Sequence, residues 1–248
     1  MKKLLIGLFV SLATLNAGTI NIAVAANVSY AIDELKAEFA KTNPDTKVMV
    51  TLGSSGKLTA QIKHGAPYGL FMAANMKYPQ ALYNDKIATT KPVVYAQGAL
   101  AYLSVNKQNF AEGIELLKKD SINKVAVANP KTAPYGKAAI EAIKNAKLYK
   151  EVQPKFVYAE SISQTVTYAI SAADIGIIAK SSLYSDKMKQ YKKGVNWAAV
   201  DPKLYTPIKQ GIVLLKNKQD DPGYQAFYKF MLSEKAKEIL RSYGYIAE

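Results

Sequence analysis

Apolar and polar positions change their period several times within the first hundred residues of the chain. Residues 19–24 alternate and are rich in β-branched side chains, which is typical of a strand. In 28–39 the apolar residues recur at spacings of four, three and four, which predicts an amphipathic helix with Asn27 as its N-cap. Strand signals at 47–52 and 69–74 are each followed by a short helical pattern. This alternation predicts a mostly parallel sheet with helices on both faces.

The remainder of the chain repeats this order of strand and helix patterns. Strand patterns occur at 99–105, 124–128, 156–159, 175–178 and 208–215, and helical patterns at 139–143, 161–170, 224–232 and 235–243. Because no Ser/Gly-rich or Pro-rich spacer separates the halves, we expect two α/β lobes joined by strands. We expect the last helix to pack on the first lobe, so that the chain crosses between lobes near Gln97 and Gln210. The predicted lobes are 18–97 with 210–248, and 98–209.

The N-terminus carries the pattern of an export signal. Two lysines follow Met1, an apolar stretch extends to Leu15, and the small residue Ala17 provides a cleavage site, so we predict a signal peptide over 1–17. No cysteine is available for a lipid anchor, and no later segment approaches about 18 consecutive apolar residues. We therefore expect a protein that is free in a periplasmic compartment and does not insert into the membrane.

The amino-acid composition limits the kinds of catalytic and metal-binding site that the chain can form. The chain has 248 residues, half of them apolar, which is enough for two lobes with cores of their own. With no cysteine and one histidine, disulfides, thiolate nucleophiles, zinc–thiolate sites and His-rich metal sites are excluded. A Ser-His-Asp triad would need His64, which we expect to lie exposed at a helix end. We therefore predict neither an enzyme nor a bare-cation site.

The net charge of +14 rests almost entirely on lysine, because Arg241 is the only arginine. Base readout and bidentate phosphate contacts favour the guanidinium group, so this balance indicates a solvated basic surface and no nucleic-acid partner. A positive surface also raises the encounter rate with small anions.

Four turns share a property that points to a ligand. Each follows a predicted strand and places small, hydroxyl or amide residues before a helix: Ala26-Asn27, Ser54-Ser55-Gly56, Tyr135-Gly136 and Ser161-Ile162-Ser163. Ligands of open α/β sheets bind outside the carboxyl ends of strands, and helix N-termini present unpaired N–H groups with a partial positive charge. Two turns belong to each half, so a cleft between lobes could enclose a small anion with uncharged donors.

These turns carry a family resemblance over essentially the whole chain after the signal. The chain resembles the periplasmic molybdate-binding proteins, the substrate-binding components of molybdate ABC importers. The motifs are Ala25-Ala26-Asn27, Ser54-Ser55-Gly56-Lys57-Leu58, Gly65-Ala66-Pro67-Tyr68-Gly69, Asn129-Pro130, Ala133-Pro134-Tyr135-Gly136 and the C-terminal segment 235–244. The resemblance implies a type II periplasmic binding fold, with two α/β lobes, two crossing strands and the ligand in the cleft between them.

The resemblance also implies a ligand set. Matched position by position, the oxyanion ligands are Asn27, Ser55, and the backbone N–H groups of Tyr135 and Ile162, with Ala26 N–H as a further donor. One branch of the family has serine in place of Asn27 and a ligating tyrosine in place of Ala179, and this chain is similar to the other branch. Family members also carry aspartate where this chain has Gly69.

From the resemblance we expect binding of molybdate and of the similarly sized tungstate, delivery to an ABC permease and its ATPase, no cofactor, and a monomer. Three alternatives stay open at this point. Another oxyanion such as sulfate would use the same donors. The 17 tyrosines allow a ferric-ion site, although no carboxylate or histidine cluster accompanies paired tyrosines. The basic surface also allows a polyanion-binding adhesin, whose affinity would fall steeply with salt.

Overall fold

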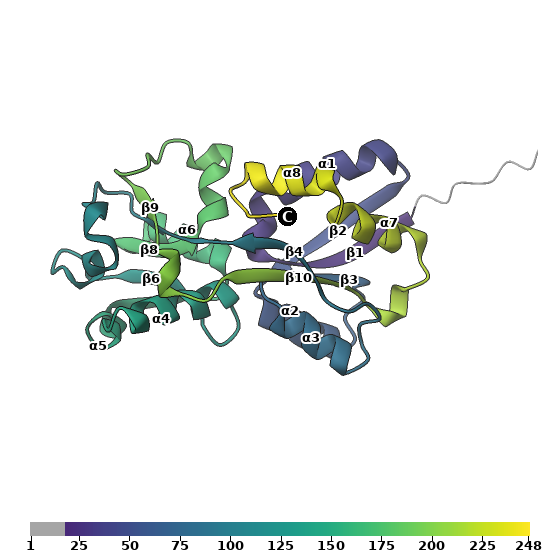
Figure 1. Cartoon of the computed structure of the whole chain (residues 1–248), viewed down its shortest axis with the longest axis horizontal. Coiled ribbons are helices and arrows are strands. Elements are labelled where there is room, and N and C mark those ends of the chain that lie inside the picture. Colours follow the sequence, from purple (N-terminus) through teal and green to yellow (C-terminus); the bar gives the residue numbers. More distant parts are fainter. Residues whose placement is uncertain (1–17) are drawn as a thin grey trace, which may run out of the picture.

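Two five-stranded sheets lie along the long axis of the molecule, each with helices on both faces (Figure 1). The structure is a computed structural model that describes residues 18–248, and the predicted signal over 1–17 lies outside the described residues. Within 18–248, no helix is both long and apolar enough to cross a bilayer. We call the first sheet with its helices the first lobe, and the second sheet with its helices the second lobe.

The first sheet has the strand order β2-β1-β3-β10-β4. β1 pairs in parallel with β2 and β3, whereas β10 runs antiparallel to β3 and β4. The strands are β1 (Gly18–Ala25), β2 (Thr46–Gly53), β3 (Leu70–Ala73), β4 (Val93–Gly98) and β10 (Ile208–Leu214).

Helices from both ends of the chain cover this sheet. On one face lie α1 (Ile32–Thr42), α7 (Pro222–Met231) and α8 (Glu234–Ser242), and on the other lie α2 (Ser55–Lys63) and α3 (Lys77–Asn84) (Figure 1). The C-terminal helices therefore complete a core that the N-terminal segment begins.

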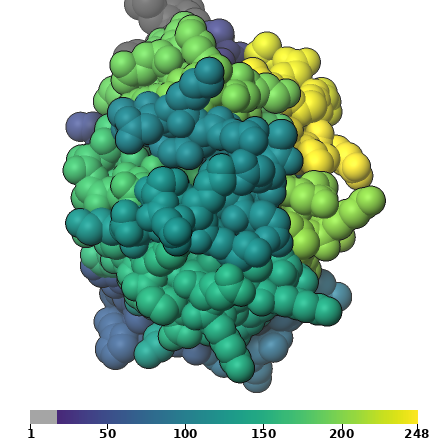
Figure 2. Space-filling view, turned by 90° about the vertical axis from the view of Figure 1, so that its left-hand side faces the viewer, coloured from purple at the N-terminus to yellow at the C-terminus, as the bar shows by residue number. Residues whose placement is uncertain are grey.

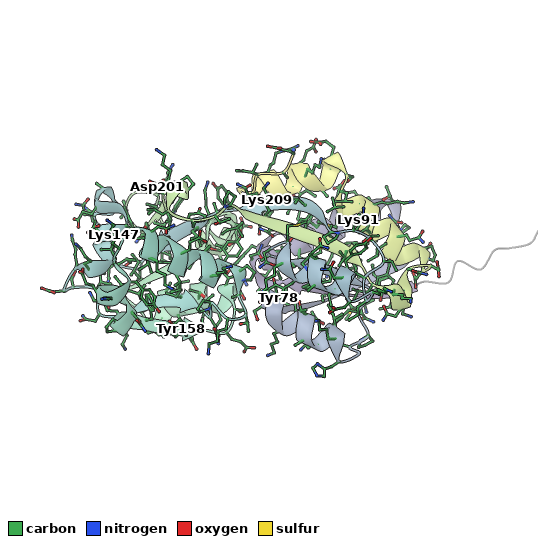
Figure 3. All side chains as sticks on the ribbon, turned by 60° about the horizontal axis from the view of Figure 1, so that its bottom comes forward. Tyr78, Lys91, Lys147, Tyr158, Asp201 and Lys209 are labelled. Carbon is green, nitrogen blue, oxygen red and sulfur yellow. The ribbon has the colours of Figure 1, made fainter. Side chains whose placement is uncertain are left out.

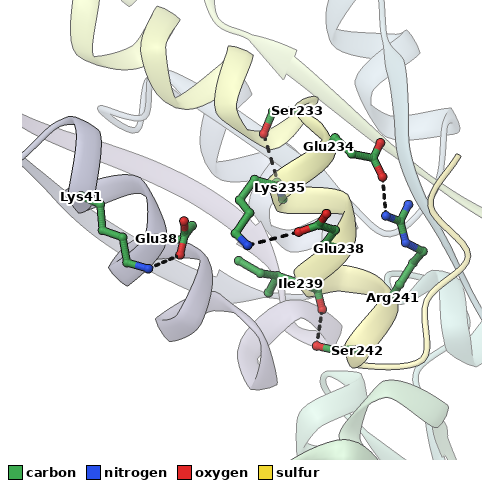
Figure 4. Close-up of polar contacts among 10 residues, drawn as sticks. Glu38, Lys41, Ser233, Glu234, Lys235, Glu238, Ile239, Arg241 and Ser242 are labelled. Atoms are coloured by element: carbon green, nitrogen blue, oxygen red, sulfur yellow. Dashed lines mark hydrogen bonds and ion pairs between the residues drawn. The ribbon is translucent and has the colours of Figure 1, made fainter.

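Contacts within and beside α8 fix this C-terminal element. The core that α8 packs against includes Phe39 of α1 and Phe227 of α7, whose ring centroids lie 5.0 Å apart in an edge-to-face arrangement. Ser233 caps α8 by accepting the N–H of Ala236, and an ion pair joins Glu234 in the first turn of α8 to Arg241 in its last turn (Figure 4). The predicted packing of the last helix on the first lobe is present in the structure.

The second sheet has the order β7-β6-β8-β5-β9, and the second lobe forms most of one end of the molecule (Figure 2). β6 is parallel to β7 and β8, whereas β5 is antiparallel to β8 and β9. The strands are β5 (Leu100–Leu103), β6 (Val125–Ala128), β7 (Phe156–Ala159), β8 (Ile175–Ala179) and β9 (Trp197–Ala199). The α-helices are α4 (Pro134–Asn145), α5 (Tyr149–Val152) and α6 (Ile162–Ser171).

The chain passes between the lobes from β4 to β5 and returns from β9 to β10, and β4 and β10 are neighbours in the first sheet. In each sheet only the strand that receives the chain from the other lobe, β10 or β5, runs against the other four, and this gives two parallel and two antiparallel pairings. The prediction of a mostly parallel sheet holds for strand direction, because four of the five strands in each sheet run the same way, but the reversed strand makes both sheets mixed. β4 and β9 are strands that the sequence analysis does not predict, although each contains a short apolar run; β9 has only three residues, and both are partly exposed.

Candidate functional site

The four turns singled out in the sequence meet at one cavity between the lobes. Its wall consists of Ala25, Ala26, Asn27, Gly53, Ser54, Ser55, Ala74, Ala133, Pro134, Tyr135 and Ile162. The five residues that the resemblance implied as ligands, Ala26, Asn27, Ser55, Tyr135 and Ile162, are all on this wall. The first lobe supplies the lining up to Ala74 and the second lobe supplies the rest.

The size and charge of the cavity restrict what it can hold. Its volume is about 10 Å³, far below the roughly 300–1,000 Å³ of sites for organic ligands. No residue of the wall carries a charge, although the protein as a whole is strongly basic. The cavity therefore has no room for an organic ligand, and an ion held there would contact neutral groups.

Three α-helices begin at the cavity wall. α2 begins at Ser55, α4 at Pro134 and α6 at Ile162, and each follows a strand of its own lobe. The first N–H groups of a helix have no intrahelical acceptor and carry a partial positive charge. These termini come from both lobes, so the wall presents fixed donors from two sides without a cationic side chain.

Two serines at the start of α2 add hydroxyl groups. Ser55 is fully buried, and its Oγ accepts the N–H of Ala74 at 2.9 Å, which leaves the hydroxyl proton free to donate. The Oγ of Ser54 is buried and has no hydrogen-bond partner among residues 18–248. A buried hydroxyl without a partner is costly, so a ligand that accepts its proton would remove that cost. Ser54 belonged to the predicted turn but was not selected as a ligand.

Asn27 does not have the capping role predicted from the sequence. It lies inside a 3₁₀ helix, Ala26–Tyr30, and α1 begins only at Ile32 with no side-chain cap. Its side-chain Nδ2 donates instead to Gln210 Oε1 at 2.8 Å and to Tyr245 Oη at 2.9 Å. Because both amide protons are used, the remaining donor of Asn27 toward the cavity is its backbone N–H.

A buried polar cluster lies behind the cavity where the crossing strands meet. We call it the hinge network and define it as Asn27, Tyr95, Tyr135, Gln210 and Tyr245. Tyr95 Oη donates to Gln210 Oε1, Gln210 Nε2 donates to Tyr135 Oη, and Tyr245 Oη donates to the carbonyl of Asn27. Burial raises the pKa of Tyr95 and Tyr135 well above their ordinary value and that of Tyr245 to about 12. The three phenols are therefore neutral at physiological pH and place no negative charge behind the wall.

The C-terminal segment also reaches the second lobe. Gly244 has a φ of +73° and lies against the ring of Tyr184, where a Cβ would approach Cε2 to 2.4 Å. Ser181 of the second lobe donates to the carbonyl of Asn27 at 3.3 Å. The lobes are thus in contact on the hinge side through residues of three separate segments.

On the opposite side of the cavity the lobes meet through contacts that we call the lip contacts. The N–H of Gly56 donates to the carbonyl of Thr132 at 2.9 Å, and Lys57 forms an ion pair with Glu160. Tyr78 also donates its hydroxyl proton to the carbonyl of Lys131 at 3.3 Å, and Figure 3 shows Tyr78 beside the junction of the lobes. The lip contacts bring the lobes together in front of the cavity.

Other candidates from the sequence lie away from the cavity. His64 is exposed at the C-terminal end of α2, the opposite end from Ser55. Ala179 ends β8 and does not line the cavity. A Cβ at Gly69 would lie 2.5 Å from the ring of Tyr224, so packing of α7 requires a small residue there. Within 18–248, no group of His, Cys, Asp and Glu side chains is arranged to hold a metal ion.

The fold and the enclosed cavity are those of a binding protein, and comparison with known proteins assigns the chain to a family. The family described as "Bacterial extracellular solute-binding protein" matches residues 20–246, and the chain belongs to this family. It is 35% identical to the molybdate-binding protein ModA of Rhodobacter capsulatus over 94% of this chain and 90% of that protein. It is 32% identical to ModA of Azotobacter vinelandii over 92% of this chain and 90% of that protein.

A solved structure shares the whole architecture. The periplasmic molybdate-binding protein of Azotobacter vinelandii superposes with a TM-score of 0.84, at 28% sequence identity, covering 92% of this chain and 99% of that one. The two-lobed α/β fold of periplasmic binding proteins, expected from the sequence, is confirmed.

Proposed function

We propose that the protein binds molybdate in the cavity between its lobes and delivers it to an ABC importer. The observation that carries this proposal is the composition of the wall: small, uncharged, and supplied with hydroxyl and N–H donors by both lobes. The molybdate-binding relatives at 35% and 32% identity support the same ligand.

The proposed donors are the hydroxyls of Ser54 and Ser55 and the backbone N–H groups of Asn27, Tyr135 and Ile162, with Ala26 N–H beside them. Hydrogen bonds to an ionised acceptor contribute about 1.5–3 kcal/mol each. Six such bonds total about 9–18 kcal/mol before the cost of association, the same order as the roughly −12 kcal/mol of a nanomolar complex. The backbone N–H groups of this set cannot accept a hydrogen bond, so they favour a fully deprotonated dianion over a protonated one.

Capture proceeds by closure of the lobes. We assign 18–97 with 210–248 to the first lobe and 98–209 to the second. When the lobes are apart, each presents half of the donors, so an anion on one lobe stabilises the closed form because only closure satisfies its remaining oxygens. The closed form would be the species that a permease and its ATPase accept, and the protein acts as a monomeric carrier in the periplasm without catalysis.

The same donors accept tungstate, whose size and charge are close to those of molybdate. Sulfate is smaller, so we expect it to reach fewer of these donors at the same time than molybdate does. Neutral, buried phenols and the absence of a carboxylate or histidine on the cavity wall disfavour ferric ion as the ligand.

Titration calorimetry with molybdate, tungstate, sulfate, phosphate and ferric citrate tests the proposal. We expect tight binding of the first two only. Ser55→Ala should weaken molybdate binding by about tenfold to a hundredfold, the effect of one hydrogen bond to an ionised acceptor. Ser171→Ala, which alters an exposed hydroxyl at the end of α6, is the matched control and should bind as the wild type does. Unchanged affinity in Ser55→Ala would remove Ser55 from the site, and the absence of any molybdate heat in the wild type would refute the function.

A further inference from the structure

Gln210 occupies an unusual position in the strand that carries the chain back between the lobes. It lies in β10, where the pairing with β4 shifts register between Gln210 and Gly211, and its side chain is fully buried. Every other buried position of this strand is apolar or glycine. A buried amide is retained only where its hydrogen bonds are made, so its partners define its role.

The partners of Gln210 belong to both lobes. Its Oε1 accepts from Asn27 Nδ2 at 2.8 Å and from Tyr95 Oη at 2.8 Å, both in the first lobe. Its Nε2 donates to Tyr135 Oη of the second lobe at 3.1 Å. Asn27 and Tyr135 both line the cavity, so one amide contacts the wall from two sides.

The backbone around Gln210 is shaped to allow this bridge. A Cβ at Gly98, on the neighbouring strand β4, would lie 1.9 Å from Tyr135 Oη and 2.8 Å from Gln210 Nε2. Only glycine leaves room for the phenol of the second lobe to reach the amide. The bridge therefore depends on three elements: the turn at Asn27, the start of α4 and the crossing strands.

We propose that Gln210 is a positioning residue that couples closure of the lobes to the geometry of the anion cavity. It does not contact the anion. It holds the Asn27 turn and the first turn of α4 at a fixed separation, and its bond to Tyr135 requires the closed arrangement. This role rests on the proposed function, since the cavity is taken as the anion site.

Gln210→Met keeps the length of the side chain and removes all three hydrogen bonds. We expect its affinity for molybdate to fall by about tenfold or more, because 1.4 kcal/mol corresponds to tenfold and several bonds are lost. Gln97→Met is the matched control: Gln97 lies on β4 beside the same crossing, and its backbone, not its side chain, makes the hydrogen bonds to Ile246. We expect Gln97→Met to bind and close as the wild type does.

A distance measurement separates positioning from general destabilisation. Because the chain has no cysteine, Lys47→Cys on the first lobe and Lys150→Cys on the second accept spin labels at unique, exposed sites. In the otherwise wild-type protein, molybdate should shorten and narrow the distance between labels. In Gln210→Met, at the molybdate concentration that saturates the wild type, the distribution should stay broad and long. Closure identical to that of the wild type would overturn the proposal.

Tyr135→Phe provides a second, gentler test that keeps the backbone N–H of Tyr135. It removes only the bond to Gln210, so it should reproduce part of the affinity loss, and combining it with Gln210→Met should add little to Gln210→Met alone. Fully additive losses would overturn the coupling. A labelled wild-type protein that gives no response to molybdate would instead refute the proposed function, so the two failures are distinguishable.

Discussion

The two sides of the anion cavity hold the lobes together by different means. On the hinge side the contacts are buried, neutral and interlinked, and they join segments as far apart in sequence as Asn27 and Tyr245. On the lip side they are a backbone hydrogen bond at Gly56 and an exposed ion pair between Lys57 and Glu160. The hinge network keeps its strength because water is excluded from it, whereas exposed charges are screened.

This difference indicates that the two sides have different roles in stability and in closure. Breaking a buried network leaves polar groups unsatisfied, so the hinge side should determine the stability of the fold. The lip contacts can exchange their partners for water at little cost, so they can form and separate each time the lobes close. Four experiments, in decreasing order of expected effect, test whether the two sides behave in this way.

Alkaline titration of the hinge tyrosines should give the largest effect, although burial also raises the pKa of Tyr30 and Tyr102, which lie outside the hinge network. Burial raises the pKa of Tyr245 from 10.0 to about 12, so its contribution to stability is complete below pH 10 and is lost as the pH rises through the folded-state value. This residue alone accounts for about 3 kcal/mol between pH 10 and pH 12, and Tyr95 and Tyr135 shift in the same direction. The free energy of unfolding, measured by chemical denaturation from pH 7 to pH 12, should stay level and then fall, and Tyr245→Phe should reduce that fall. A decline that begins near pH 8 would contradict this reading.

Gly98→Ala should give the next largest effect, again on stability. The added methyl group would overlap the hydroxyl of Tyr135, which is enclosed by the hinge network. The methyl group would also lie 2.8 Å from Gln210 Nε2, on a strand of the same sheet, so we expect about 1–3 kcal/mol of destabilisation even in the anion-free protein, the usual cost of overpacking a core. Thermal denaturation without ligand measures it. A variant as stable as the wild type would show that the hinge network accommodates the added methyl group without cost.

Gly56→Ala is the matching substitution on the lip side, and it should affect affinity instead of stability. Its Cβ would lie 2.7 Å from Tyr78 Oη and 3.0 Å from Thr132 Cα, but opening of the lobes relieves the contact with Thr132. We expect the anion-free melting temperature to be maintained, because alanine is favoured over glycine in a helix by up to about 1 kcal/mol. Molybdate affinity should fall about tenfold in calorimetry. A loss of stability as large as that of Gly98→Ala would erase the contrast between the two sides.

Removal of the Lys57–Glu160 ion pair should have the smallest effect. Both side chains are more than half exposed, so Lys57→Met should change molybdate affinity by less than about fivefold at low salt, in line with exposed pairs worth about 0.2–1 kcal/mol. Molybdate dissociation rates at low and high salt measure this effect, and the difference in rate between Lys57→Met and the wild type should vanish at high salt. Lys63→Met breaks a similarly exposed pair with Asp85 inside the first lobe and serves as control. A salt-independent effect of Lys57→Met would mean that the lysine acts in another way.

Much of the fold was predictable because the signals were local. The apolar runs at 124–128 and 156–159 predict strands, and the residues that follow the strands identify the turns that meet at the cavity. Helix starts at Ser55 and Ile162 follow from polar residues placed before an apolar period. These features depend only on neighbours within a few positions, so the sequence displays them directly.

The hinge network could not be predicted in the same way. Its partners lie 75 to 218 positions apart, and no local pattern links Gln210 to Asn27 or Tyr135. Asn27 looked like a helix cap because capping and long-range hydrogen bonds use the same side-chain type. The one available signal was an amide within the otherwise apolar strand near 208–215, which indicates a buried polar group but not its partners.

The bond between Asn27 and Tyr245 also has a consequence for how the protein is made. The turn that follows the first strand receives this hydrogen-bond partner from a residue 218 positions later in the chain. Contacts of such long range are slow to form, and a nascent polypeptide cannot complete them. We therefore expect the cavity to be among the last parts assembled, so that a shortened molecule without Tyr245 does not sequester the ion.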